Sequence, residues 1–116
     1  MANKEALNLL KAENVNDFNR WAKLRRKKGK KGVNLKGQQL SGLKLRYIDL
    51  RGARLAGADL HDTDLEGADL READLREANL QNAKLDLCNL SRANLKRANR
   101  EGASFSKAHL KGAKGL

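Results

Sequence analysis

A histidine flanked by carboxylates is the first group in this chain that could do chemistry: Asp59, His61 and Asp62 lie within four residues. Imidazole and carboxylate are ligand types that Zn²⁺ accepts, so these residues could form a weak metal site. Nothing in their spacing enforces a coordination geometry, and such a group is more often ordinary surface. We therefore expect no bound metal here and no cofactor elsewhere in the chain.

The other reactive side chains do not form a catalytic set. Cys88 is the single cysteine, which excludes an internal disulfide, and His109 is isolated among alanine, leucine and lysine residues. No serine has a base placed beside it, and no glycine-rich loop that could hold phosphates is present. We expect that the protein is not an enzyme.

Basic side chains are concentrated in the segment from residue 25 to residue 32: Arg25, Arg26, Lys27, Lys28, Lys30 and Lys31. Residues 1–32 hold ten Lys and Arg against three acids (+7), and residues 33–116 hold fifteen against eleven (+4), which gives +11 in total. This excess favours polyanions. The alternative is a solvated, disordered linker without a partner. The run has no aromatic residues, so it is not a platform for stacking single-stranded bases.

The elements that position these side chains follow a repeat of five residues. Leucine occupies 14 of the 16 positions spaced by five from 35 to 110, and a small residue usually stands two positions earlier. The intervening residue is usually Asp or Asn, as in Ala58-Asp59-Leu60 and Ala93-Asn94-Leu95. A period of five fits neither a strand nor a helix. It indicates a repeat architecture instead.

These in-phase triplets resemble the pentapeptide repeat family, whose unit is A-(D/N)-L-x-x. The resemblance covers about residues 33–115, and it implies a right-handed quadrilateral β-helix with one pentapeptide for each of four walls. Sixteen pentapeptides make about four coils of twenty residues. Each unit has too few apolar side chains for a core of its own, so stacking must bury the leucines and alanines. The expected fold is an all-β solenoid, with Cys88 filling an inward small-residue position.

Residues 1–32 have a different pattern, and we expect them to form a helical N-terminal cap and a basic linker before the solenoid of residues 33–116. Apolar residues from Val15 to Leu24 recur at spacings of three and four, which predicts an amphipathic helix after a first short one. Short helices need a surface to dock on. The bulky inward residues Val33, Leu43 and Ile48 of the first coil could supply it, with Phe18 and Trp21 buried against them.

The register sorts the solenoid charges by wall. The wall of Leu35, Leu55, Leu75 and Leu95 displays Lys36, Arg54, Arg76, Lys96 and Arg97 against Asp74 and Glu77. The adjacent wall of Leu50, Leu70, Leu90 and Leu110 displays Arg51, Arg71, Arg92 and Lys111 against Asp49, Asp69 and Glu72. The wall of Leu40, Leu60 and Leu80 is acidic, with Asp59, Asp62 and Glu101. These basic residues and the basic run are the candidate partner-binding residues. The alternative is that mixed charges merely keep the surface soluble.

Three functions fit these observations. The first is an interaction module for an acidic macromolecule, which could be nucleic acid, a ribonucleoprotein or an acidic protein. The second is a structural scaffold or assembly subunit. The third follows from the resemblance, because some pentapeptide repeat proteins imitate DNA and inhibit or protect DNA gyrase, but that role needs a long acidic rod and this chain is short and basic.

Location and oligomeric state complete the expectations. No apolar run reaches the length of about 20 residues that spans a membrane, and the N-terminus has no signal-like apolar stretch, so we expect a cytoplasmic protein with no small-molecule substrate. Arg100 occupies an inward central position of the last coil, where leucine is the rule. Because a dry seam would trap its charge, we expect Arg100 to lean out toward water or pair with Glu101, and the protein to be a monomer.

Overall fold

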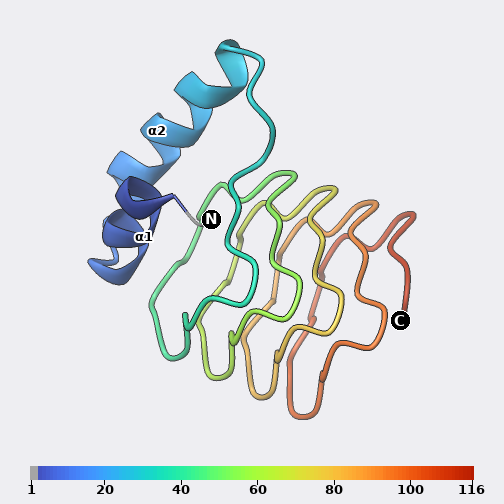
Figure 1. Ribbon diagram of the computed structural model, residues 1–116. Coiled ribbons are helices and arrows are strands. Elements are labelled where there is room, and N and C mark those ends of the chain that lie inside the picture. Colours follow the sequence, from blue (N-terminus) through green and yellow to red (C-terminus); the bar gives the residue numbers. More distant parts are fainter. Residues whose placement is uncertain (1–2) are drawn as a thin grey trace.

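The computed structural model describes residues 3–116, in which two helices precede a stack of coils (Figure 1). Helix α1 spans Lys4–Lys11 and helix α2 spans Val15–Lys27. Each begins after an asparagine whose side chain accepts a backbone N–H: Asn3 from Ala6 at 3.1 Å and Asn14 from Asp17 at 3.2 Å. These caps satisfy amides that have no partner inside a helix. No helix in the described part of the chain has the length and apolar character needed to cross a membrane.

After the helices the chain winds in coils of twenty residues, stacked side by side in Figure 1. Parallel β-bridges join residues twenty apart, from Asn34 with Arg54 to Asn94 with Lys114. Each wall pairs through a single bridged residue per coil, so residues 3–116 contain isolated bridges and no extended strand. The expected all-β character therefore takes the form of bridges, because a turn begins directly after each one.

That turn explains the unit of five residues. In the second coil, for example, the N–H of Ala73 donates to the carbonyl of Leu70 at 3.0 Å, and Glu72 between them has φ of 61°. A positive φ at this position is what a type II turn requires. The last residue of every unit from 33 to 112 has it, seven glycines and nine other residues. The Asp or Asn before each leucine also contributes, since Asp69 Oδ1 accepts the N–H of Arg71 at 3.2 Å.

The core is a column of leucines and small residues. Leu60 and Leu80 have no exposed surface, so the prediction that the central leucines point inward is confirmed. Thr63 and Cys88 fill small-residue positions, and each donates to a carbonyl of the preceding coil: Thr63 Oγ1 to Leu40 at 2.9 Å and Cys88 Sγ to Leu65 at 2.8 Å. Burial raises the pKa of the Cys88 thiol to about 12, so it stays protonated as a core residue.

The helices lie against the first coil and supply partners for its backbone. Asn19 accepts the N–H of Asp49 at 2.8 Å and donates to the carbonyl of Tyr47 at 3.0 Å, while Glu13 accepts the N–H of Lys44 at 2.5 Å. Phe18 is buried as expected. Trp21 is only half-buried, in contrast to the prediction: it packs against the core with its ring centroid 5.5 Å from that of Phe18, and the guanidinium of Arg25 lies over its ring.

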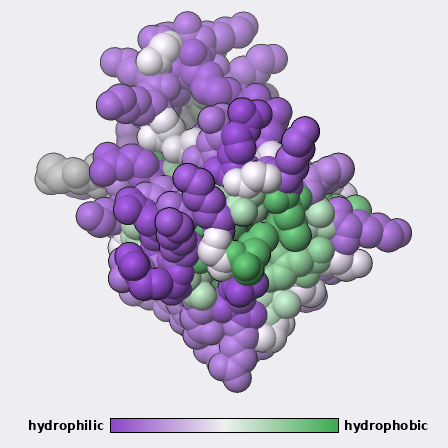
Figure 2. All heavy atoms as spheres, turned by 90° about the vertical axis from the view of Figure 1, so that its right-hand side faces the viewer, coloured by the Kyte–Doolittle hydropathy of each residue, from purple (hydrophilic) through white to green (hydrophobic). Residues whose placement is uncertain are grey.

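The last coil presents apolar side chains at the opposite end. Leu110 is 38% exposed and Leu116 is 50% exposed. Figure 2 views this end and shows hydrophobic side chains bordered by hydrophilic ones. Arg100 is exposed here, as expected for a side chain that reaches water.

Candidate anion-binding groove

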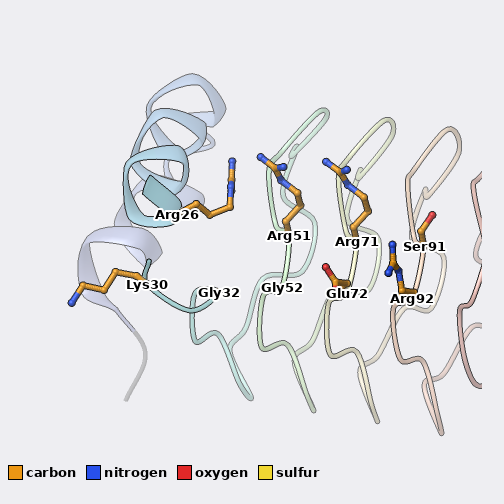
Figure 3. A pocket seen from close by; sticks show the side chains of 9 residues that line it. All are labelled: Arg26, Lys30, Gly32, Arg51, Gly52, Arg71, Glu72, Ser91 and Arg92. Atoms are coloured by element: carbon orange, nitrogen blue, oxygen red, sulfur yellow. The ribbon is translucent and has the colours of Figure 1, made fainter. Parts of the chain in front are cut away.

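A groove of about 350 Å³ runs along the wall of Leu50, Leu70 and Leu90, beginning at the end of α2. We call it the basic groove, and it is lined by Arg26, Lys30, Gly32, Arg51, Gly52, Arg71, Glu72, Ser91 and Arg92. Figure 3 shows Arg26, Arg51 and Arg71 in a row along the stacking direction. A second hollow of about 440 Å³ shares Ser91 and Arg92 and extends the groove to Lys111.

The arginine row is held in place by aspartates of the same repeats. Arg71 contacts Asp69 with Nε at 2.9 Å and Nη2 at 2.6 Å. Arg51 contacts Asp49 in the same manner at 3.3 Å for both nitrogens, and Nη2 of Arg26 donates to Oδ2 of the same carboxylate at 2.6 Å. Such two-point contacts fix the plane of a guanidinium as well as its position. The row is therefore preorganised before any partner arrives.

The ion pairs keep these side chains charged. Partial burial alone would raise the pKa of Asp49, but hydrogen bonds from Arg51 and Arg26 outweigh it and hold that pKa below its ordinary value. The hydrogen bond that Arg71 donates to Asp69 raises the pKa of Arg71 further above neutrality. Asp49 and Arg71 therefore both stay ionised at neutral pH.

Positive charge exceeds negative charge in the groove. Five cations line it, and Asp49, Asp69 and Glu72 oppose them, which leaves 5 − 3 = +2. Neither Lys30 nor Arg92 has a carboxylate within ion-pair distance among residues 3–116. The charge of Arg92 is available to an incoming anion, whereas the Lys30 side chain points away from the arginine row in Figure 3 and must turn toward the groove to reach one.

Glycines make the floor of the groove. A Cβ on Gly32 would collide with the carbonyl of Gly52, so the linker can approach the first coil this closely only with glycine at position 32. Gly32 and Gly52 both line the groove, and neither contributes a side chain to it. An anion can therefore reach the basic side chains without displacing others.

The structure divides the fifteen candidate residues into separate groups. Five of them line the basic groove: Arg26, Lys30, Arg51, Arg71 and Arg92. Lys111 lies in the extension of the groove, whereas Lys27, Lys28 and Lys31 do not line it. Arg25 is partly structural, since it stacks on Trp21 at 4.9 Å and donates to the carbonyl of Lys31 at 3.0 Å.

The remaining five lie on the wall of Leu35 and Leu55, away from the groove. There Arg76 pairs with Asp74 at 2.8 and 2.7 Å and Arg97 with Glu77 at 3.6 Å, while Lys36, Arg54 and Lys96 stand beside them. The sequence did not lead us to predict that aspartates orient the arginines through ion pairs, or that glycines line the groove. The Asp-Leu-Arg triplets at 49–51, 69–71 and 74–76 are the pattern from which the ion pairs could have been predicted.

The histidine on the acidic wall is paired with its neighbour. His61 Nδ1 lies 2.6 Å from Asp59 Oδ1, and Nε2 lies 3.9 Å from Asp62 Oδ2. The hydrogen bond with Asp59 raises the pKa of His61 and lowers that of Asp59. Across residues 3–116, no three His, Cys, Asp or Glu side chains are arranged to hold a metal ion.

The five-residue repeat identifies the family. Residues 34–72 and 73–112 match the family model described as "Pentapeptide repeats (8 copies)", and together they cover more than half of the 116 residues. The chain belongs to the pentapeptide repeat family. No curated protein matches this pentapeptide repeat chain at a significant level.

Solved structures of other pentapeptide repeat proteins are similar to it. HetL from the cyanobacterium Nostoc sp. strain PCC 7120, involved in heterocyst differentiation regulation, is 39% identical over 70% of this chain, with a TM-score of 0.67. Rfr23 from the cyanobacterium Cyanothece 51142 is 40% identical over 71%, with a TM-score of 0.63. QnrB1, a plasmid-mediated fluoroquinolone resistance protein, is 26% identical over 69%, with a TM-score of 0.66. The matches cover 38%, 59% and 39% of those chains, respectively.

Proposed function

We propose that this pentapeptide repeat protein is a non-enzymatic interaction module that binds an acidic macromolecule through the basic groove, with nucleic acid as the partner that fits best. The observation that supports this most is the row of Arg26, Arg51 and Arg71, extended by Lys30 and Arg92, whose charge exceeds that of the nearby carboxylates. Phosphate backbones are bound by such preorganised cations without base-specific contacts.

The architecture in this proposal is a right-handed quadrilateral β-helix of about four coils in residues 33–116, with residues 1–32 as its helical cap and basic linker. The contacts of Asn19 and Glu13 with backbone amides of the first coil support the cap, because these amides would otherwise form an unpaired edge. We also propose that the protein is cytoplasmic and monomeric and that it has no small-molecule substrate.

The test is binding of labelled RNA and duplex DNA, measured by fluorescence anisotropy at several salt concentrations. We expect dissociation constants of about 10⁻⁴ to 10⁻⁶ M that weaken steeply as salt rises. The triple variant Arg51→Gln/Arg71→Gln/Arg92→Gln should bind more weakly, with a shallower salt dependence. The triple variant Lys44→Gln/Lys84→Gln/Lys107→Gln loses the same charge on another wall, and it should bind nearly as well as the wild type.

Neutralising the basic run as a whole provides a second check, because Arg26 and Lys30 belong to the groove. A variant in which glutamine replaces all six basic residues should also bind more weakly: Arg25, Arg26, Lys27, Lys28, Lys30 and Lys31. If neither RNA nor DNA binds at low salt with protein in large excess, the structural scaffold becomes the better assignment. A DNA-mimic role against gyrase, which the family resemblance suggested, is a third option, and the net charge of +11 opposes it because mimicry needs an acidic surface.

A further inference from the structure

We propose that the basic groove is a pocket for a chain of phosphate groups, and that a bound phosphate chain fastens α2 and the linker to the solenoid. This inference rests on the proposed function and narrows it in two respects. It names phosphate in preference to carboxylate as the ligand chemistry. It also assigns the ligand a structural effect at the junction between the helices and the coils.

The pocket is built from parts of the chain that are far apart in sequence. Arg26 comes from the end of α2, Lys30 from the linker, and Arg51, Arg71 and Arg92 from three successive coils. All five line one hollow of about 350 Å³, a volume within the range of small-ligand sites of about 300 to 1,000 Å³. A ligand with several charged groups can contact the linker and the coils at the same time.

The guanidinium groups have donors to spare. A guanidinium carries five N–H donors. Asp69 occupies the edge formed by Nε and Nη2 of Arg71, and Asp49 occupies the same edge of Arg51. Nη1 of both arginines has no hydrogen-bond partner among residues 3–116. The aspartates already hold the arginines in place. Binding of a ligand through Nη1 therefore costs little additional side-chain entropy.

Phosphate suits this pocket better than carboxylate. The chain supplies its own carboxylates to one edge of each arginine, and a single further carboxylate would add one charge against a residual +2 with Lys30 and Arg92 unpaired. A phosphate chain presents more oxygens and more charge in a comparable volume, and guanidinium groups bind phosphate oxygens in pairs.

Binding should stabilise the junction. The linker side and the coil side both carry positive charge at the pocket, and the ion pair between Arg26 and Asp49 at 2.6 Å is the contact there that opposes the repulsion. An anion between the two sides replaces repulsion with attraction. A ligand that binds only the folded form then raises the melting temperature by mass action.

The experiment uses the full chain and sodium tripolyphosphate as the probe, with citrate at equal ionic strength as the carboxylate control. Affinity is measured by isothermal titration calorimetry, stability by thermal melting, and the junction by hydrogen exchange of residues 28–33. We expect tripolyphosphate to bind, to raise the melting temperature above the value in citrate, and to slow exchange in this segment.

Two double variants locate the site. Lys30→Gln/Arg92→Gln removes the two unpaired charges without breaking an aspartate pair, and it should weaken tripolyphosphate binding by about tenfold or more. Lys84→Gln/Lys107→Gln removes equal charge from another wall and should leave the affinity within a few-fold of the wild type. Equal losses in the two variants would overturn the inference, because they would show a response to net charge alone.

The remaining outcomes separate this inference from the proposed function. Equal effects of citrate and tripolyphosphate would exclude phosphate selectivity, and an unchanged exchange rate in residues 28–33 would exclude the fastening role. If RNA binding depends on the groove while tripolyphosphate does not bind, the inference fails and the proposed function stands. If tripolyphosphate binds and RNA displaces it, a nucleic-acid backbone uses the same pocket. Binding of tripolyphosphate alone would support the pocket and contradict nucleic acid as the partner.

Discussion

At the residue scale, the Asp or Asn that precedes most of the central leucines has two roles. Its side-chain oxygen accepts the backbone N–H two residues later, as between Asn94 and Lys96 at 3.1 Å, and this closes the turn. Where arginine follows the leucine, the same carboxylate also holds the guanidinium, as between Asp74 and Arg76 at 2.8 Å. One residue type therefore shapes the backbone and orients the charges, so the surface chemistry of a wall depends on the residue after leucine.

A pH-dependent prediction follows for Asp49. Its pKa is lowered in the folded protein, whereas the unfolded value is about 3.9. The ionised carboxylate therefore contributes stability above about pH 4, and this contribution is lost as pH falls through the folded pKa. In urea denaturation from pH 7 to pH 3, Asp49→Asn should be less stable than wild type at pH 7, with a difference that shrinks at the acidic end. A difference independent of pH would mean that Asp49 acts through shape alone.

The turn position with positive φ allows a matched pair of substitutions. Gly57 has φ of 68° with open space around its Cα, so Gly57→Ala should cost about 1 kcal/mol from backbone strain alone. Leu87 has φ of 63° and is 50% exposed, so Leu87→Asn should gain up to about 1 kcal/mol, because asparagine tolerates this conformation better. Chemical denaturation of both variants checks the two signs. A stabilising Gly57→Ala would show that the turns relax.

At the element scale, the walls could be predicted because a burial period of five fixes which side chains point inward. The groove could not, since its shape depends on where the linker crosses the first coil and on which corner residues are glycine. Trp21 shows the same limit. Its spacing in α2 suggested burial with Phe18, but Arg25 covers its ring in a half-exposed position. Sequence periodicity predicts which face of a helix or wall is buried. How deeply a side chain on that face is buried depends on the neighbours packed against it.

Removing residues 1–26 tests the role of the helices. Phe18, Leu10 and Ala6 are buried with the solenoid core, so the truncated chain should expose apolar surface on the first coil together with the amides of Lys44 and Asp49. We expect lower heat stability and concentration-dependent association, measured by thermal melting and analytical ultracentrifugation. A truncated protein that stays monomeric and equally heat-stable would rule out a capping role.

At the scale of the whole molecule, the two ends of the stack differ. The first coil is in contact with the helices, while the last coil of the 116-residue chain presents apolar and basic side chains together. Residues 96–114 hold six Lys and Arg, which are Lys96, Arg97, Arg100, Lys107, Lys111 and Lys114, against Glu101, so this end carries 6 − 1 = +5. Two such ends facing each other would bring like charges together around the apolar surface.

Arg100 is the residue at this end that departs most from the repeat, and it lies exposed where the preceding coil has the buried Leu80. A second copy stacked on this face would have to bury its guanidinium or displace it, and burying an unpaired charge is costly. We therefore expect the wild-type 116-residue chain to sediment as a monomer, and Arg100→Leu to shift it toward a dimer in analytical ultracentrifugation across a concentration series. Lys96→Leu adds equal apolar surface at an outward position, and it should remain monomeric. If both variants dimerise, general hydrophobicity and not the position of Arg100 controls assembly. If neither does, the remaining rim charges are sufficient to keep the ends apart.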